Sequence, residues 1–423
     1  MFNNKQGHSL ERVLGNFILL ILLLPQLPVI FQRSELHINI FALSLSILAL
    51  LLYRTKIEKK SYIIPLLYFI SMQLFLFFSS WFGTEGFSSF GEIPSYFRPT
   101  MLLIITLGFL SMIKDLNSLF ANLVRVAKII TVAIFIYSIC EVFFFSLFSK
   151  VMFVFYRLED KSNIDGVAVS FFTLPYYSAY IMCTLFPLLL SNYEKNKGYS
   201  YLYCLMLIAS VFLTQSKMGV FLLIGIVFLY WFISVSLKKK IFVLIFFSVF
   251  LVALLLSLKA FVAYLNETVG GNFARTLHLM LSNTDQAHNL LERLDDIVET
   301  YQAISQHNYL VGIGLGKGET IEIWIAMVMY RYGLIGLLFF IVFFLIVGFK
   351  TMFMAMRKGF YSFEERSLFK FVCIWALTIY ISQLSGLMLE MSKGGVLSCL
   401  MFAVASKCMI NNGQTKVEGF KHA

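Results

Sequence analysis

Long apolar runs separated by short polar connections repeat along almost the whole chain. A run of about 20 apolar residues is long enough to cross a bilayer as a helix. Twelve segments approach that length: Leu14–Phe31, His37–Tyr53, Ile63–Trp81, Phe97–Ile113, Ile129–Phe148, Phe172–Ser191, Tyr201–Gln215, Met218–Leu237, Ile241–Val262, Tyr332–Phe349, Phe371–Leu389 and Gly395–Ile410. The pattern predicts an all-α polytopic helix bundle in which residues 1–423 form a single transmembrane domain of about 12 helices.

The first apolar segment, Leu14–Phe31, is similar in length to a secretory signal. No small-residue cleavage site follows it, and Pro25 and Pro28 lie inside it. We therefore expect a membrane helix that is kinked at the two prolines.

Composition and charge agree with the membrane class. Hydrophobic residues make up 59% of the chain and charged residues 13%, against about 45–50% and 25% in soluble domains. Most of the 34 Lys and Arg residues lie in connections that face one side if both termini are cytoplasmic. The net charge of +11 is thus a topology signal. The basic clusters of the chain are short and form no shared binding face, which argues against nucleic acid as a partner.

The cysteine and histidine positions indicate neither a disulfide framework nor a metal site. All six cysteines lie in or beside apolar segments, and the six histidines show no ligand spacing. We expect no metal and no cofactor.

The longest polar stretch is residues 263–331, which the charge bias places outside the cytoplasm. Within it, Ala287–Ser305 has the period of an amphipathic helix. One face carries Leu290, Leu294, Ile297, Tyr301 and Ile304, and the other carries Glu292, Asp295, Asp296 and Glu299, with Arg293 at the border.

Alternating glycines follow this helix at Gly312, Gly314, Gly316 and Gly318. They match neither a dinucleotide fingerprint nor a P-loop, because Lys317 interrupts the first and the second is incomplete. The next segment, Ile321–Tyr330, is too short to cross a bilayer. We expect a re-entrant helix buried in the outer face, with Glu322 at its start and the next span beginning at Tyr332–Gly336.

Three segments resemble the O-antigen polymerase and ligase family (Wzy and WaaL types) of bacterial inner-membrane glycosyltransferases. Leu213–Gly219 (LTQSKMG) resembles the family's Ser-Arg or Ser-Lys step at an outer helix junction. Arg293–Gly316 resembles its late periplasmic loop, and Glu322–Gly336 resembles the segment that re-enters the membrane. In the ligase branch a histidine leads that segment, whereas this chain has Glu322, which favours a polymerase.

The resemblance implies a GT-C-like architecture in the bacterial inner membrane, with the active site facing the periplasm. It implies inverting transfer between undecaprenyl-diphosphate-linked oligosaccharides, with membrane lipid as surroundings and a chain-length regulator as a possible protein partner. The leaving group is a pyrophosphate, so the chemistry requires fixed cations and a proton acceptor. The catalytic candidates are Glu322, Arg293 and Lys217, and the substrate-binding candidates are Arg275, Asp296, Glu299, Lys317, Arg331, Gly314 and Gly316.

Other interpretations remain open. Between Ala263 and Tyr332 acidic residues outnumber basic ones, so a general positive field is absent and a few placed cations must hold the pyrophosphate. Lys217 can also be an interfacial anchor and Arg293 an ion-pair partner of Asp296, and the bland interpretation of Lys317 is a solvated turn residue. Glu141 and Lys259 lie within apolar segments and can either pair or face an outer cavity. The alternatives to a polymerase are an O-antigen ligase, which transfers the polysaccharide to lipid A core, and a lipid-linked oligosaccharide flippase.

Overall fold

The computed structural model describes residues 4–410 except 28–29, 31–35, 54–57, 83–92, 157–165, 236, 269–287, 316–320, 322, 358, 385, 387 and 391. The described residues form helices and contain no strand, which confirms the predicted all-α class. Six described helices are long and apolar enough to cross a membrane: Leu36–Tyr53, Lys60–Phe82, Leu116–Phe143, Lys217–Ser234, Trp324–Met356 and Ser392–Ile410. These helices identify a helical membrane protein.

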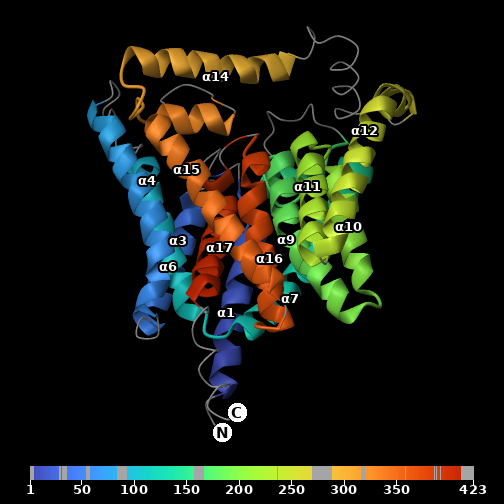
Figure 1. Cartoon of the computed structure of the whole chain (residues 1–423), viewed down its shortest axis with the longest axis horizontal. Coiled ribbons are helices and arrows are strands. Elements are labelled where there is room, and N and C mark those ends of the chain that lie inside the picture. The colour runs from blue at the N-terminus through green and yellow to red at the C-terminus, as the bar shows by residue number, and fades with distance from the viewer. Residues whose placement is uncertain are drawn as a thin grey trace.

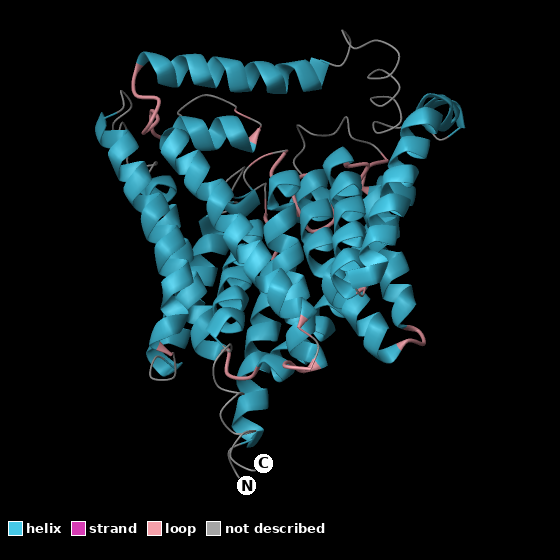
Figure 2. Ribbon diagram, viewed as in Figure 1, coloured by secondary structure: helices cyan, strands magenta, loops and turns pink. Residues whose placement is uncertain are grey.

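Most helices stand side by side, and α14 lies across one end of the bundle (Figures 1 and 2). We call the end next to α14 the loop end and the opposite end the base. The helices are α1 (Asn4–Leu23), α3 (Leu36–Tyr53), η2 (Lys59–Tyr62), α4 (Ile63–Phe82), α5 (Ile93–Tyr96), α6 (Arg98–Met112), α7 (Leu116–Phe143), α8 (Phe145–Phe155), α9 (Pro175–Asn196), α10 (Ser200–Leu213), α11 (Lys217–Ser234), α12 (Leu237–Thr268), α14 (His288–Gln306), α15 (Trp324–Met356), α16 (Phe363–Ser382), η6 (Met388–Glu390) and α17 (Ser392–Ile410).

The core of the bundle surrounds α17, whose side chains are almost all buried, and α16, whose side chains are mostly buried. Phe402 of α17 lies at the centre of an aromatic cluster, with ring centroids 4.7 Å from Tyr68, 5.3 Å from Trp375 and 5.9 Å from Phe344. Aromatic pairs at these distances stabilise beyond the area that they bury. The cluster joins α4, α15, α16 and α17 and so fixes the helices that reach the loop end.

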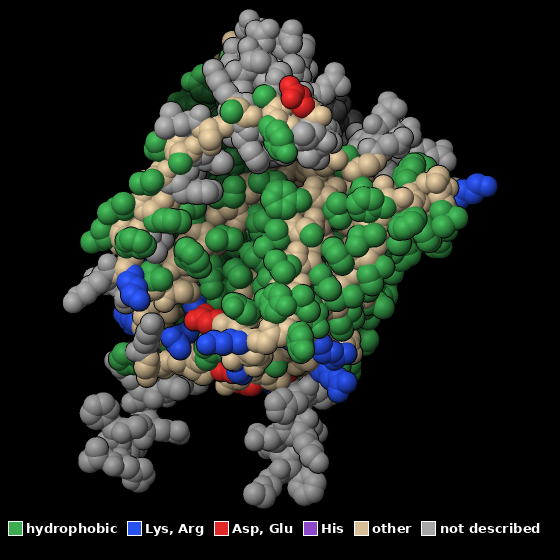
Figure 3. All heavy atoms as spheres, turned by 90° about the vertical axis from the view of Figure 1, so that its right-hand side faces the viewer, with side chains coloured by type: hydrophobic (Ala, Val, Ile, Leu, Met, Phe, Trp, Pro, Cys, Tyr) green, Lys and Arg blue, Asp and Glu red, His purple; other side chains and the backbone are tan. Residues whose placement is uncertain are grey.

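The outer surface of the bundle is apolar at mid-height. Figure 3 shows hydrophobic side chains over this part of one face and Lys and Arg gathered mainly along its lower edge. Exposed large residues such as Leu51, Phe143, Phe242 and Leu338 have relative accessibilities above 60%. An apolar belt with a basic margin is the surface expected of a bilayer-embedded protein.

Two predicted helix boundaries at the N-terminal side are wrong. Helix α1 does not continue through a kink but ends at Leu23, two residues before Pro25. A proline disfavours helical geometry in the residue before it, so the helix ends instead of bending. Helix α7 begins at Leu116 and not near Ile129, because Asp115 caps it by accepting from the backbone N–H groups of Asn117 and Ser118.

The amphipathic helix of the long loop is confirmed as α14, but its buried face is narrower than predicted. Ile304 and Thr300 are buried and Ile297 packs against Ile304, whereas Tyr301 is 52% exposed. The helix contacts α15 along the line of positions 297, 300 and 304. Tyr301 lies one position, or about 100° of turn, beyond that line and faces away.

A short helical segment lies where the re-entrant helix was predicted, and it begins at Trp324. Trp324, Val328 and Tyr330 are buried, and the segment joins the rest of α15 through a break at Gly333, where φ is 67° and ψ is −172°. This break lies at the predicted step into the next span.

Candidate functional site

The connection before α9, residues 166–174, is held at the loop end by a buried carboxylate of α7. Glu141 is 1% exposed, and its Oε2 atom accepts hydrogen bonds from the backbone N–H groups of Val169 and Ser170, both at 2.8 Å. The Ser170 hydroxyl lies 2.8 Å from that of Ser138. The carboxylate predicted from its position in an apolar segment therefore binds the backbone of this connection.

The junction between α10 and α11 holds the same connection from the other side. Ala168 donates its N–H to the carbonyl of Leu213 at 2.9 Å, and the Gln215 amide donates to the carbonyl of Gly166 at 3.2 Å. Ser216 then caps α11 by accepting from the N–H of Gly219. The segment Leu213–Gly219, which carries the family resemblance, thus packs directly on residues 166–168, and half-buried Lys217 is the first residue of α11.

A third contact comes from Lys393, in the first turn of α17. Its side chain is 3% exposed, and Nζ donates to the carbonyls of Phe171 at 2.8 Å and Leu22 at 3.0 Å. The ammonium also lies 5.2 Å from the ring centre of Phe172 and 5.5 Å from that of Tyr156. A cation near a helix N-terminus opposes the helix dipole, and a buried charge in a membrane bundle is costly, so this lysine is a candidate for function.

Sequence reasoning missed Lys393, although a signal was present. Ser392-Lys393-Gly394-Gly395 repeats the Ser-Lys-x-Gly pattern of Ser216–Gly219. Both copies lie at helix starts that pack against α9: a Cβ on Gly219 would lie 2.6 Å from that of Ala179, and one on Gly394 would lie 3.5 Å from the Tyr180 ring. The two lysines therefore begin helices on either side of α9.

The backbone around these lysines is strained. Non-glycine residues with positive φ include Leu27 at 48°, Ser170 at 56° and Gln215 at 50°. Leu27 follows the α1 end that Lys393 contacts, and the N–H groups of Gln26 and Leu27 both donate to the carbonyl of Phe155. Such conformations persist where surrounding contacts enforce them, and they concentrate at functional sites. We call Glu141, Ser170, Gln215, Lys217 and Lys393 the loop-end cluster.

The ring of Tyr156 packs beside the cluster lysine, and its hydroxyl donates to the carbonyl of Leu23 at 2.8 Å. Burial raises the pKa of Tyr156 above its ordinary value of 10.0. The phenol therefore stays neutral near pH 7 and adds no negative charge beside Lys393.

A small cavity lies between α6, α15 and α17, beside the break of α15 at Gly333. Arg98, Tyr332 and Gly395 line it, and its volume of about 20 Å³ is room for roughly one water molecule. The Nε atom of Arg98 is buried and has no hydrogen-bond partner among the described residues. Arg98 is a second cation that sequence reasoning missed, because it is the second residue of the predicted apolar segment Phe97–Ile113.

The glycines after α14 have a packing role. The carbonyl of Tyr330 accepts from the N–H groups of Ile313 at 2.8 Å and Gly314 at 3.3 Å. A Cβ on Gly312 would lie 2.6 Å from the Tyr330 oxygen, so only glycine permits this approach. Gly314 is buried with φ of 125° and is brought next to the α15 turn that contains Arg331. Gly312 and Gly314 therefore dock the loop on the helix break.

The other predicted site residues divide by location. Asp296 is half-buried and Glu299 is exposed on α14, over α15, whereas Lys217 lies beside α9 and residues 166–168. Arg331 is half-buried about two turns into α15. Arg293 lies on α14 but its side chain is outside the described part of the structure, as are the side chain of Lys259 and the whole of Arg275, Gly316, Lys317 and Glu322.

Comparison with protein-family models, with curated proteins and with solved structures found no match.

Proposed function

We propose that this protein polymerises undecaprenyl-diphosphate-linked oligosaccharide repeat units into O-antigen or a related surface polysaccharide. In this proposal it is a bacterial inner-membrane glycosyltransferase with about twelve spans and a GT-C-like architecture. Its termini are cytoplasmic and its loop end faces the periplasm. The single observation that carries the proposal is the convergence of the loop-end cluster. The Ser-Lys segment of the family resemblance and a second, buried Ser-Lys step hold the same strained connection.

The twelve-span arrangement is supported by helices beyond the six long apolar ones. α6 and α10 are apolar but shorter, and α1, α9, α12 and α16 stand in the same bundle (Figure 1). Adding these six to the six long helices gives the number of segments that the hydropathy pattern predicts. The basic margin at the base agrees with a cytoplasmic location of that end (Figure 3).

The proposed reaction transfers a glycosyl group with inversion. The bond between the donor sugar C1 and the pyrophosphate oxygen breaks, and a hydroxyl oxygen of the acceptor sugar bonds to C1. The hydroxyl proton goes to a base and undecaprenyl diphosphate leaves. Cations stabilise the negative charge that develops on the leaving oxygen. Lys217 is assigned this role because it starts α11 beside the strained connection, and lysine supplies a point charge for phosphate.

Lys393 acts in this account as a positioning residue. Its ammonium joins the carbonyls of Leu22 and Phe171, so it fixes the end of α1 against the connection that packs on the Lys217 helix junction. Glu322 is assigned as the proton acceptor, and this assignment rests on the family resemblance alone.

The test is reconstitution of the purified protein in liposomes with a lipid-linked repeat unit and with lipid A core. A polymerase yields a ladder of chain lengths, and a ligase yields a product only when lipid A core is present. A flippase moves the lipid-linked unit across the bilayer without forming a new glycosidic bond. A ladder that disappears in Lys217→Ala but persists in Lys217→Arg would support the assignment of Lys217. A full ladder in Lys217→Ala would reduce this residue to an interfacial anchor.

A further inference from the structure

A cleft of about 530 Å³ opens at the base, at the opposite end of the bundle from the loop-end cluster. It lies between the start of α7, the end of α9, the start of α10 and the start of α16. Its walls combine basic side chains with apolar ones. The lining residues are Asn117, Phe120, Ala121, Val124, Arg125, Lys128, Ile129, Asn192, Lys195, Asn196, Tyr203 and Glu364.

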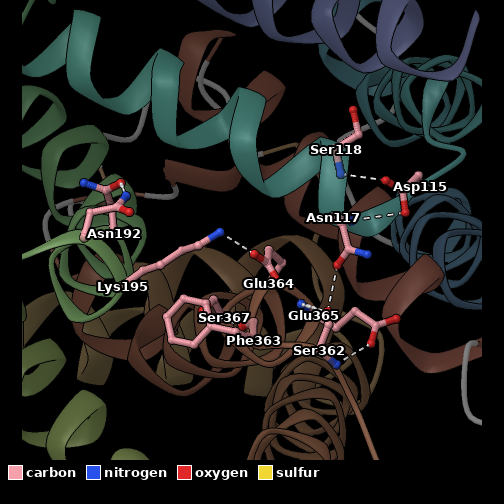
Figure 4. Close-up of polar contacts among 11 residues, drawn as sticks. Asp115, Asn117, Ser118, Asn192, Lys195, Ser362, Phe363, Glu364, Glu365 and Ser367 are labelled. Atoms are coloured by element: carbon pink, nitrogen blue, oxygen red, sulfur yellow. Dashed lines mark hydrogen bonds and ion pairs between the residues drawn. The ribbon is translucent and has the colours of Figure 1, made fainter. Parts of the chain in front are cut away.

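The cleft carries an excess of positive charge. Arg125, Lys128 and Lys195 face a single carboxylate, that of Glu364. Lys195 extends from α9 and forms an ion pair with Glu364 of α16, as Figure 4 shows. Arg125 and Lys128 have no acidic partner among the described residues, and Lys128 lies 5.3 Å from the ring centre of Tyr203.

The other carboxylates near the cleft are engaged elsewhere. Asp115 caps α7, Glu365 accepts from the backbone N–H of Ser362, and Glu194 accepts from Lys370 at 2.9 Å (Figure 4 shows the first two). The charges of Arg125 and Lys128 are therefore left for a ligand from outside the described chain.

The height of these two residues in the bilayer suggests the ligand. A hydrocarbon core of about 30 Å corresponds to roughly 20 helical residues. Counted from the loop end of α7 at Phe143, that length ends near Val124. Arg125 and Lys128 thus lie at the boundary between hydrocarbon and headgroups, where lipid phosphates are found. Val124 and Ile129, beside them, provide apolar wall for an acyl chain.

We propose that this cleft binds the phosphate of an anionic glycerophospholipid from the leaflet at the base. Arg125 and Lys128 contact the phosphate, and the acyl chains follow the apolar wall of α7. The Nδ2 groups of Asn192 and Asn196 already donate to Ser200 and to Asn192, so these amides form part of the cleft wall. Basic pockets between membrane helices on the cytoplasmic side are suited to such headgroups. Simple snorkelling of the two side chains would not require a cleft whose walls come from four helices.

The test uses the full chain purified in detergent and titrated with phosphatidylglycerol or phosphatidylcholine, with bound lipid counted by native mass spectrometry. The wild type should bind phosphatidylglycerol in preference to phosphatidylcholine. The double variant Arg125→Gln/Lys128→Gln should bind it about thirtyfold more weakly, at roughly fivefold for each basic residue removed. The charge-retaining variant Arg125→Lys/Lys128→Arg should keep most of the affinity, which shows that the fold tolerates changes at these positions.

The matched control is Lys350→Gln/Arg357→Gln, which removes two exposed basic residues at the base that do not line the cleft. It should bind phosphatidylglycerol like the wild type. Equal binding in the cleft and control variants would overturn the proposal. Displacement of the lipid by an excess of inorganic phosphate would assign the site to free phosphate, and binding of a polyglutamate peptide in place of lipid would assign it to an acidic protein. Neither result bears on polysaccharide synthesis.

Discussion

Replacing Gly333 by alanine tests whether the loop after α14 is docked on the break of α15. Gly333 has φ of 67° and ψ of −172°, a region that is essentially restricted to glycine, and a side chain there costs about 1–3 kcal/mol. A Cβ would also lie 2.2 Å from the carbonyl oxygen of Leu310. The contact is with backbone, which cannot rotate aside, so the loop must separate from α15.

While the bonds from Ile313 and Gly314 to Tyr330 persist, local separation at residues 309–310 breaks the two hydrogen bonds that these residues accept, from the N–H of Leu334 to Tyr309 at 3.0 Å and from the N–H of Ile335 to Leu310 at 3.3 Å. At about 0.5–1.5 kcal/mol each, they bring the total to roughly 2–6 kcal/mol. A central value of about 4 kcal/mol corresponds to an increase in local opening on the order of a thousandfold. Hydrogen–deuterium exchange of peptides from this segment should detect it.

Substitutions at two other glycines separate the effect of backbone strain from the effect of the clash with the Leu310 backbone. Gly359→Ala places a side chain at φ of 96° with no atom within 4 Å, so it should cost about 1–2 kcal/mol of strain and expose only its own turn. Gly225→Ala meets its nearest atom at 3.5 Å in a regular helix and should leave exchange unchanged. Wild-type protection around Leu334 in Gly333→Ala would refute the docked-loop geometry.

Three further predictions concern charged residues. Glu141→Ala should leave the N–H groups of Val169 and Ser170 without their acceptor, at about 1–3 kcal/mol each, and make residues 166–172 sensitive to protease. Glu141→Gln keeps an acceptor oxygen and should protect these residues. Equal cleavage of the two variants would contradict this role. The hydrogen bond from Lys195 holds the pKa of Glu364 below its ordinary value of 4.5, so this pair should stabilise the protein above that pH and lose its effect as pH falls through the lowered pKa. The half-exposed pair contributes at most about 1 kcal/mol, and melting curves of Glu364→Gln should lack that acid-dependent component. Lys393→Met should lower the melting temperature, because the carbonyls of Leu22 and Phe171 lose their donor at about 1–3 kcal/mol each, and it should abolish polymer synthesis in the protein that stays folded; full synthesis would remove Lys393 from the site.

The helices of the bundle were predictable because bilayer length and apolar composition are local properties of the sequence. The predicted segment Ile63–Trp81 matches α4 to within one residue, and the amphipathic period found α14. The predicted helix boundaries were wrong where a single capping residue or proline sets the end of a helix. Asp115 caps α7 at Leu116, well before the predicted start at Ile129, and α1 ends just before Pro25.

The candidate site was only partly predictable, because its contacts join distant segments. Lys393 bonds to Leu22 and Phe171, which lie 371 and 222 residues away in sequence. No periodicity or local motif in the sequence specifies contacts between segments so far apart. The connection 166–174 is also too short and irregular to give a recognisable sequence pattern. Lys217 and Glu141 were found because a charge or motif interrupted an apolar run, whereas the basic cleft at the base required the packing of four helices.

The central claim is most directly tested by counting lipid carriers released during chain growth. Purified protein in liposomes is given a lipid-linked repeat unit, and undecaprenyl diphosphate and glycosidic bonds are measured in the same reaction. Polymerisation predicts that one carrier is released for every new bond and that both quantities fall together in Lys217→Ala. Movement of the lipid-linked unit across the bilayer with no carrier released would contradict the account and identify a transporter.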